Sequence, residues 1–411
     1  VKGVFTNTNP VDAYRGAGRP EAAYLIERLM DKSARELNIS PLEIRRINLI
    51  DKKDMPYKTA LGHTYDSGDF KKNLSDCLTL ADYKSFESRK NISLKNNKYR
   101  GIGISTYIEA CGGGGPEYCY LKIGGNGNVE VKIGTQSNGQ GHITSYSQIV
   151  SEVLDIDIDQ INIIQGNSIE IPKGSGTGGS RSMPVGGNAL FLASKKFLKK
   201  TQELLAIHLK TNPKNIIYDK GFFKFNDKSY SFADLTKLFD SLESLNINAD
   251  WTPKPGTYTY PNGTHICELE IDKYTGLISI LNYTVVDDFG KVINPLLLEG
   301  QVHGGIAQGI GQALFEETIY DDESGQLLTG SFMDYAIPRA SDVPLIKFDY
   351  NEVLCANNPL GIKGAGEAGA IGAPPAVINA VCNALNIHHI DMPAKPEKVW
   401  QILSNNKSII I

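Results

Sequence analysis

The stretch GIKGAGEAGAIGAPPAVINAV, residues 361–381, sets a single carboxylate, Glu367, between four glycines and continues into Pro374-Pro375. Glycine loses more conformational freedom on folding than any other residue, so a run this dense needs a geometric reason. Either a tight turn happens to carry a glutamate, or the backbone comes close to a ligand while one acid points at it. The proline pair predicts the start of a helix, because proline suits the first helical turn.

Length, composition and charge limit the class of protein to which the chain can belong. The 411 residues predict two or more structural units, and 41% hydrophobic with 21% charged residues is typical of a globular protein. A net charge of −4 with both signs interspersed gives no electrostatic case for nucleic acid or an anionic membrane. No apolar run approaches the ~20 residues that span a bilayer. We therefore expect a soluble protein with neither partner.

The six cysteines are scattered without a Cys-x-x-Cys pair, which argues against iron–sulfur or zinc sites in this chain and against a disulfide framework. Reduced structural thiols in a cytoplasmic protein are the simplest interpretation. The seven histidines show no spacing suited to a metal, and no Gly-x-Ser-x-Gly hydrolase motif occurs. The chain begins in mid-motif, so we expect a fragment, a processed product or half of a split protein.

Hydrophobic periodicity predicts the elements. Helices are expected at 20–37, 40–50 and about 69–83, and strands from about 100. A hairpin at 120–134 is followed by a helix after SNGQGH, a strand at 161–165 and a long helix at 186–209. A second hairpin at 267–288 precedes a glycine-bearing helix at 304–317, with 210–260 as connector. This order predicts an α+β fold of two related subdomains, in segments 1–100, 101–250 and 251–411.

Five glycine-rich segments stand out: 13–19 (AYRGAGR), 139–142 (GQGH), 176–182 (GTGGSRS), 300–312 (GQVHGGIAQGIGQ) and 361–369 (GIKGAGEAG). None is a phosphate-binding loop of the Walker type or a dinucleotide fingerprint. Several share the order strand, glycine turn, helix start, which points backbone N–H groups at an anion. Any one alone is more often a tight turn; five together favour a large phosphate-bearing cofactor.

Taken together and in this order, the motifs AYRGAGRPEA, GQGH, TGGSRS, GQVHGGIAQGIGQAL and KGAGEAG resemble those of the molybdenum hydroxylases, the xanthine oxidase and aldehyde oxidase family. That family includes the large chain of aerobic carbon monoxide dehydrogenase, and the resemblance covers essentially the whole chain. It implies the molybdenum-cofactor-binding domain of a molybdopterin subunit, with the cofactor in its cytosine dinucleotide form. All three segments then belong to that domain, with the catalytic glutamate in 251–411.

The resemblance also implies roles for residues. Glu367 would be the catalytic base, and its flanking glycines would let the bulky cofactor approach. The protein would supply no metal ligand, since the pterin holds the molybdenum. The residues implied to bind the cofactor are Arg15, Gly16, Ala17, Gly139, Gln140, Gly141, His142, Gly178, Gly179, Ser180, Arg181, Ser182, Gln301, Gly364, Ala365 and Gly366.

Two departures from the family pattern shape the expected function. Gly16 stands where the copper–molybdenum carbon monoxide enzymes have a cysteine, so we expect hydroxylation of an aldehyde or nitrogen heterocycle instead. Only the C-terminal half of the usual subunit is present, so its N-terminal half, an iron–sulfur subunit and an FAD subunit are expected partners. A non-catalytic cofactor-binding remnant is the main alternative, and another kind of glycine-rich nucleotide-binding protein is a weaker one.

For the substrate pocket itself, the sequence offers four candidates that are each more typical of core or surface positions: Tyr14, Tyr107, Glu109 and Phe332.

Overall fold

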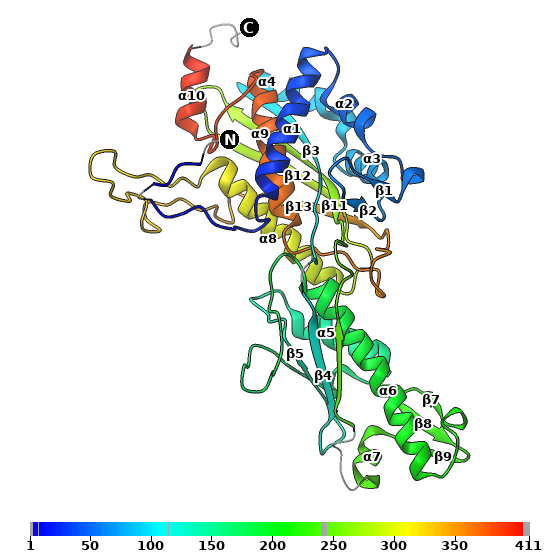
Figure 1. Cartoon of the computed structure of the whole chain (residues 1–411). Helices are drawn as coiled ribbons and strands as arrows, with labels where there is room; N and C mark the ends of the chain where they lie inside the picture. Colours follow the sequence, from blue (N-terminus) through cyan, green and yellow to red (C-terminus); the bar gives the residue numbers. More distant parts are fainter. Residues whose placement is uncertain (1–2, 7, 114, 240–244, 406–411) are drawn as a thin grey trace.

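The computed structural model describes residues 3–6, 8–113, 115–239 and 245–405, which form two lobes (Figure 1). The terminal lobe contains the first and the last of the described residues. Its helices are α1 (Arg19–Glu36), α2 (Pro41–Asn48), α3 (Phe70–Leu80), α4 (Phe86–Lys95), α8 (Pro295–Leu314), α9 (Ala368–Leu385) and α10 (Pro396–Asn405). Its strands are β1 (Tyr57–Lys58), β2 (Thr64–Tyr65), β3 (Lys98–Ile108), β11 (Asn262–Asp272), β12 (Ile278–Asp288) and β13 (Ile346–Asn351).

The terminal lobe is built on a sheet of order β13-β12-β11-β3, antiparallel except for the parallel pair β12 and β13. Side chains alternate along β11. Cys267 and Leu269 face the core shared with α8 and α9, whereas Ile266 faces a second cluster with Leu74 and Cys77 of α3. The sheet is therefore covered by helices on both faces, which is why β11 is buried along nearly its whole length.

Helix α9 lies so close to the edge strand β3 that glycine is required there. A Cβ at Gly103 would lie 2.1 Å from the carbonyl oxygen of Ala376. The same helix satisfies the free edge of β3, because Asn379 donates to the carbonyl of Ile104 at 2.9 Å. The Oδ1 of Asn383 accepts a hydrogen bond from the backbone N–H of Ile102 in the same strand at 3.1 Å. An unpaired sheet edge is thus closed by a helix.

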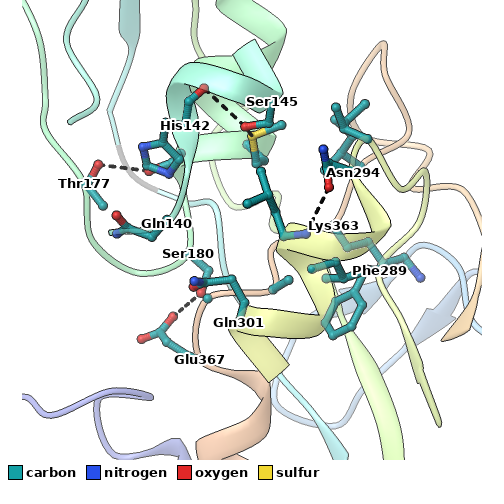
Figure 2. A pocket seen from close by; sticks show the side chains of 18 of the residues that line it. Gln140, His142, Ser145, Thr177, Ser180, Phe289, Asn294, Gln301, Lys363 and Glu367 are labelled. Carbon is teal, nitrogen blue, oxygen red and sulfur yellow. Dashed lines mark hydrogen bonds between the residues drawn. The ribbon is translucent and has the colours of Figure 1, made fainter. Parts of the chain in front are cut away.

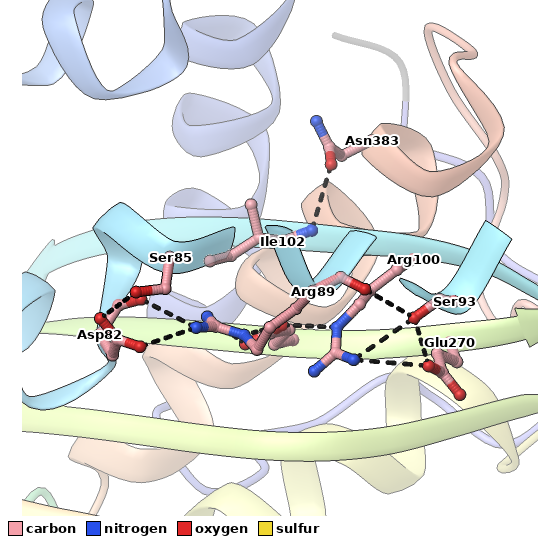
Figure 3. A network of polar contacts seen from close by, with 9 residues as sticks. Asp82, Ser85, Arg89, Ser93, Arg100, Ile102, Glu270 and Asn383 are labelled. Atoms are coloured by element: carbon pink, nitrogen blue, oxygen red, sulfur yellow. Dashed lines mark hydrogen bonds and ion pairs between the residues drawn. The ribbon is translucent and has the colours of Figure 1, made fainter. Parts of the chain in front are cut away.

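Helix α4 is held to the sheet by ion pairs (Figure 3). Arg89 makes a two-pronged contact with Glu268 of β11, with both N–O distances at 2.9 Å, and Arg100 of β3 donates to the same carboxylate at 2.6 Å. Ser93 donates to Glu270 at 2.5 Å. Because charged contacts replace an apolar stripe, the hydrophobic pattern did not predict this helix.

The middle lobe holds the sheet β10-β4-β5-β6 with α5 and α6 packed on it and a small sheet, β7-β8-β9, with α7 at its tip (Figure 1). Its strands are β4 (Glu117–Ile123), β5 (Val129–Ile133), β6 (Ile161–Ile164), β7 (Ile217–Asp219), β8 (Phe222–Phe225), β9 (Lys228–Tyr230) and β10 (Ile247–Trp251). Its helices are α5 (His142–Leu154), α6 (Asn188–His208) and α7 (Phe232–Leu238), with a π-helical turn over Ser182–Gly187 leading into α6.

The α+β class, both hairpins and the long helices are confirmed. The segment 210–260, predicted to be a connector, also contributes to the core of the middle lobe, where Phe223 and Leu235 are buried. The predicted segments 101–250 and 251–411 share a sheet, since β3 pairs with β11. The division into three segments stays a prediction.

The predicted start of helix α9 is wrong. The helix begins at Ala368, and Pro374 and Pro375 lie inside it. Each proline removes one N–H group from the helix. Helix α8 packs on α9 so tightly that a Cβ at Gly309 would lie 2.9 Å from the Cδ of Pro374. By length and composition α9 could also cross a membrane, but 94% of its 18 residues are buried, as expected of a core helix.

Candidate functional site

A cavity of about 550 Å³ lies where the two lobes meet (Figure 2). Each of the five glycine-rich segments contributes to its wall: Arg15 from the first, Gln140 from the second, Ser180 from the third, Gln301 from the fourth and Glu367 from the last. From Arg15 to Glu367 these residues span 352 positions of the chain. The structure therefore brings the five segments to one place.

Four helical segments begin at this wall. The cavity is lined by His142 at the start of α5, Ser182 at the π-helical turn, the N-cap Asn294 of α8 and the N-cap Glu367 of α9. Helix N-termini carry partial positive charge and unpaired N–H groups, so they favour anions. Among the described lining residues Glu367 is the only carboxylate. The cavity is suited to a ligand with negative charge.

Most of the predicted cofactor residues line this cavity, and some do not. Those on its wall are Arg15, Gly139, Gln140, His142, Gly178, Gly179, Ser180, Ser182, Gln301, Ala365, Gly366 and Glu367. Those not among its lining residues are Gly16, Ala17, Gly141, Arg181 and Gly364.

Arg181 differs most from expectation, because its guanidinium turns away from the cavity. It donates to Glu117 at 2.6 Å and to the carbonyl of Gly176 at 2.7 Å. Both charged side chains are buried. The pair fixes the loop 176–182 from behind, so Arg181 does not reach a ligand in the cavity.

Arg15 joins two of the glycine-rich segments. Its Nε donates to the carbonyl of Gly366 at 2.5 Å, and its terminal nitrogens donate to Gln308 at 2.9 Å and to the carbonyl of Gln301 at 3.0 Å. Burial lowers the pKa of its guanidinium, although the nearby acids, including Glu367, favour the charged form. Arg15 therefore ties the loop that carries Glu367 to α8.

Glu367 is held by two donors. Its Oε1 accepts from the backbone N–H of Gly16 at 3.1 Å and its Oε2 from the Oγ of Ser180 at 2.6 Å (Figure 2). Burial alone would raise the pKa of this carboxyl. The neighbouring Glu109 carboxyl and the hydrogen bonds from Ser180 and Gly16 outweigh burial, so the pKa lies below its ordinary value. Glu367 is ionised at neutral pH and fixed at the wall of the cavity.

Gly364 and Gly369, on either side of Glu367, serve a different purpose from the one expected. A Cβ at Gly364 would lie 2.5 Å from the Sγ of Cys111 and 2.6 Å from the carbonyl oxygen of Ser180. Gly369 packs just as closely on the backbone of α8. These glycines let protein segments touch one another. Glycines that open toward empty space are found instead at 139, 178 and 179, where an added Cβ would meet nothing within 4 Å.

Two features show that a polar cofactor fits. His142 is buried, and its Nδ1 has no hydrogen-bond partner within the described chain. Burial lowers its pKa, so the ring is neutral and can accept or donate one hydrogen bond to a ligand. The open glycines add backbone that a bulky group can approach. No cluster of three or more metal-ligating side chains occurs in the described residues, so such a cofactor would bring its own metal ligands.

Sequence reasoning missed one buried ion pair, of which the lysine lines the cavity. Lys363 lines the cavity, and its Nζ donates to Asp288 at 2.5 Å with both side chains fully buried. Charged residues inside the apolar stretches GIKG and TVVDDFG were the available signal. Two residues considered for the pocket, Tyr14 and Phe332, are exposed instead.

A family model described as molybdopterin cofactor-binding domain matches residues 76–344, more than half of the chain, and a second with the same description matches 1–49. The chain belongs to the molybdopterin cofactor-binding domain family.

Curated relatives agree with this assignment. The chain is similar to the carbon monoxide dehydrogenase large chain of Hydrogenophaga pseudoflava, 33% identical over 99% of this chain and 54% of that one. It is equally similar, at 33%, to the nicotine 6-hydroxylase large subunit of Paenarthrobacter nicotinovorans, over 97% of this chain and 52% of the relative. The crystal structure of quinoline 2-oxidoreductase from Pseudomonas putida 86 matches with a TM-score of 0.88 and 31% identity, covering 97% and 53% of the two chains. The chain thus spans about half the length of the relatives it matches.

Proposed function

We propose that the chain forms the catalytic, molybdopterin-binding portion of a molybdenum hydroxylase, with Glu367 as the general base. The observation that carries the proposal is a single ionised carboxylate at the wall of a cavity shared by all five glycine-rich segments. The family membership supplies the cofactor class. A base must be unprotonated at working pH, and the donors from Gly16 and Ser180 favour that state.

Different residues of this chain would bind the cofactor, accept the proton and position the loop that carries the base. The helix N-termini and the open glycines at 139, 178 and 179 would hold the phosphates and the pterin, while Gln140 and Gln301 offer amide hydrogen bonds. When bound, the molybdenum cofactor supplies the two-electron redox chemistry. Glu367 takes up the proton released as the oxygen nucleophile attacks an electron-poor carbon of the substrate. Arg15 keeps the loop of that base in place.

An aldehyde or nitrogen heterocycle is the proposed substrate class. Relatives are named for carbon monoxide, nicotine and quinoline, so the family name alone does not choose between these chemistries. Gly16 offers no thiol beside Glu367, and Cys111 is buried against Thr259. A cysteine thiolate is thus missing from the described wall, which favours hydroxylation over carbon monoxide oxidation.

The proposal extends to cofactor form and partners. We infer a cytosine dinucleotide cofactor and a cytoplasmic complex with iron–sulfur and FAD subunits and the remaining half of the large subunit. The six cysteines are all buried free thiols, which accords with a reducing compartment. A non-catalytic cofactor-binding remnant stays the alternative.

The deciding experiment expresses the chain with its neighbouring genes, purifies the complex and assays aldehydes, N-heterocycles and carbon monoxide. Glu367→Gln should lower turnover at least about 100-fold, the scale of a lost general base, while bound molybdenum stays unchanged. Glu36→Gln, an exposed position at the end of α1, is the control. Turnover retained by Glu367→Gln removes the residue from the role. Cofactor bound without any turnover in the unaltered complex supports the remnant.

A further inference from the structure

Arg181 belongs to the loop 176–182, the third glycine-rich segment, but it does not line the cavity. The residue is only 6% exposed. Besides its contacts with Glu117 and Gly176, it donates through its second terminal nitrogen to the carbonyl of Pro116 at 3.0 Å. One planar guanidinium therefore joins the loop to the start of β4, with several hydrogen bonds made in a fixed geometry.

Glu117, which receives Arg181, lies in a space that fits a carboxylate. It is fully buried at the first position of β4. Its carboxyl accepts from the backbone N–H of Tyr118 at 3.0 Å and from that of Ser175 at 3.4 Å. A Cβ at Gly134 would lie only 2.2 Å from its Oε1. Because a buried charge is tolerated only when it is paired and hydrogen-bonded, Glu117 and Arg181 depend on each other.

The residue before Arg181 has a backbone conformation that needs such an anchor. The φ angles of Gly179 and Ser180 are 57° and 53°, in the left-handed region. A residue with a side chain keeps that conformation only where the surrounding structure determines it. Arg181 holds the chain on one side of Ser180, and on the other the carbonyl of Gly179 accepts from the N–H of Gly112 at 3.1 Å. The backbone of Ser180 is thus fixed from both sides.

The position of Ser180 matters because its side chain reaches the candidate base. Its Oγ donates to the Oε2 of Glu367 at 2.6 Å, as Figure 2 shows. A hydrogen bond between two oxygens forms only over a narrow range of distances, about 2.5–3.0 Å, so a small displacement of the loop would weaken it. A continuous series of contacts therefore runs from Glu117 through Arg181 and Ser180 to Glu367.

We propose that Arg181 is a positioning residue: together with Glu117 it fixes the loop 176–182 so that Ser180 stays within hydrogen-bond distance of Glu367. The inference deepens the function proposed above, because it assumes that Glu367 is the base. The sequence motif implied that Arg181 binds the cofactor, whereas its contacts assign it to the support of the loop.

The other groups whose charge acts on Glu367 come from different segments. They are two arginines of the first glycine-rich segment and two residues that follow β3, namely Arg15, Arg19, Glu109 and Cys111. Within the described chain none of the four hydrogen-bonds to Arg181. A variant at position 181 that keeps the positive charge therefore leaves the charges around Glu367 in place.

Arg181→Lys is the deciding variant, because lysine keeps the charge but lacks the planar fork. Once the loop is released, Ser180 no longer stabilises ionised Glu367, so the pKa of that carboxyl rises. The acid limb of the pH profile of kcat/KM should then move upward, by up to about one pH unit. In a Ser180→Ala background the same change should move the limb no further. An unmoved limb, or an equal shift in both backgrounds, overturns the proposal.

The matched control is Arg45→Lys. Arg45 and Glu27 form a buried pair at 2.5 Å, against 2.6 Å for Arg181 and Glu117, and no side chain of either pair is more than 7% exposed. The bonds of Arg45 go to α1 and α2. Both lysine variants should lower Tm, but only Arg181→Lys should move the acid limb. A shift of equal size in Arg45→Lys would mean that the limb reports general loosening, which refutes a positioning role.

Infrared titration follows the protonation of Glu367 without turnover. In a complex labelled with 13C-glutamate, subtracting the spectrum of Glu367→Gln isolates the carboxyl band of this residue. The pH at half-protonation should rise in Arg181→Lys and stay in place in Arg45→Lys. Should Arg181→Lys not fold, Glu117→Gln decides. Loss of the anchor should raise that pH, whereas the unpaired charge of Arg181 acting alone would lower it, so a lower or unchanged value contradicts the proposal.

The two proposals fail separately. If Glu367→Gln keeps its turnover, the catalytic assignment fails while the infrared titration still tests Arg181. If the titration is unchanged in Arg181→Lys, the positioning role fails while Glu367 can remain the base.

Discussion

Replacing Lys363 by methionine tests how the loop that carries Glu367 is held. The Lys363 ammonium contacts Asp288 at 2.5 Å, and neither side chain reaches solvent. Methionine retains an apolar stem of similar length but leaves the aspartate in the interior without its counter-charge. Removing one partner of a buried ion pair costs about 3–5 kcal/mol. Asp288 keeps donors from Gly290 and Val353, both at 3.0 Å, so we expect about 3 kcal/mol.

Thermal unfolding of the purified protein measures this loss. An unfolding entropy of about 2.1 cal/mol/K per residue over 411 residues gives about 0.9 kcal/mol/K, so Lys363→Met should lower Tm by about 3–4 °C. The matched control is Lys224→Met, whose partner Asp219 also lies at 2.5 Å but with side chains 43% and 48% exposed. An exposed pair contributes at most about 1 kcal/mol, or about 1 °C. Equal losses in the two variants would refute the reasoning, and Asp288→Asn should restore part of the loss in Lys363→Met.

Further predictions concern packing and pH. Gly103→Ala should cost about 1–3 kcal/mol in urea unfolding because its Cβ would overlap the carbonyl of Ala376, whereas Gly125→Ala, which meets nothing within 4 Å, should change stability by less than about 0.5 kcal/mol. Ser180→Ala removes a donor to ionised Glu367, so the pKa of that carboxyl rises and the acid limb of kcat/KM moves to higher pH. An unmoved limb would show that Ser180 does not stabilise the charge.

A structural feature can be predicted from the sequence when the residues that determine it are neighbours in the chain. Helices such as α6 and the two hairpins follow from local period and turns, and the meeting of the five glycine-rich segments followed from their shared format. Arg181 could not be placed, because the carboxylate that captures it, Glu117, lies 64 positions away. The helix start predicted at Pro374 was wrong for the same reason. Its place inside α9 depends on α8, which packs on the helix from another part of the chain.

Glycine shows this limit most clearly, because one residue type answers two different needs. At Gly178 and Gly179 the missing side chain leaves open space, so the requirement comes from whatever occupies the cavity. At Gly364 the same absence lets the chain rest on Cys111 and Ser180, so the requirement comes from the fold. The residues next to a glycine in the sequence do not show whether it faces a ligand cavity or packs against another segment. Only the position of a distant segment does.

Ser180 occupies a backbone conformation that glycine adopts more easily. Its φ of 53° lies in the left-handed region. In the chain Ser180 directly follows two glycines, Gly178 and Gly179. Holding a serine there costs roughly 1 kcal/mol. A hydrogen bond to a charged acceptor returns about 1.5–3 kcal/mol, and the Oγ of Ser180 makes such a bond to Glu367 at 2.6 Å. The side chain is thus favoured over glycine by its contact with one carboxylate, so the local strain at position 180 and the charge state of Glu367 are parts of one arrangement.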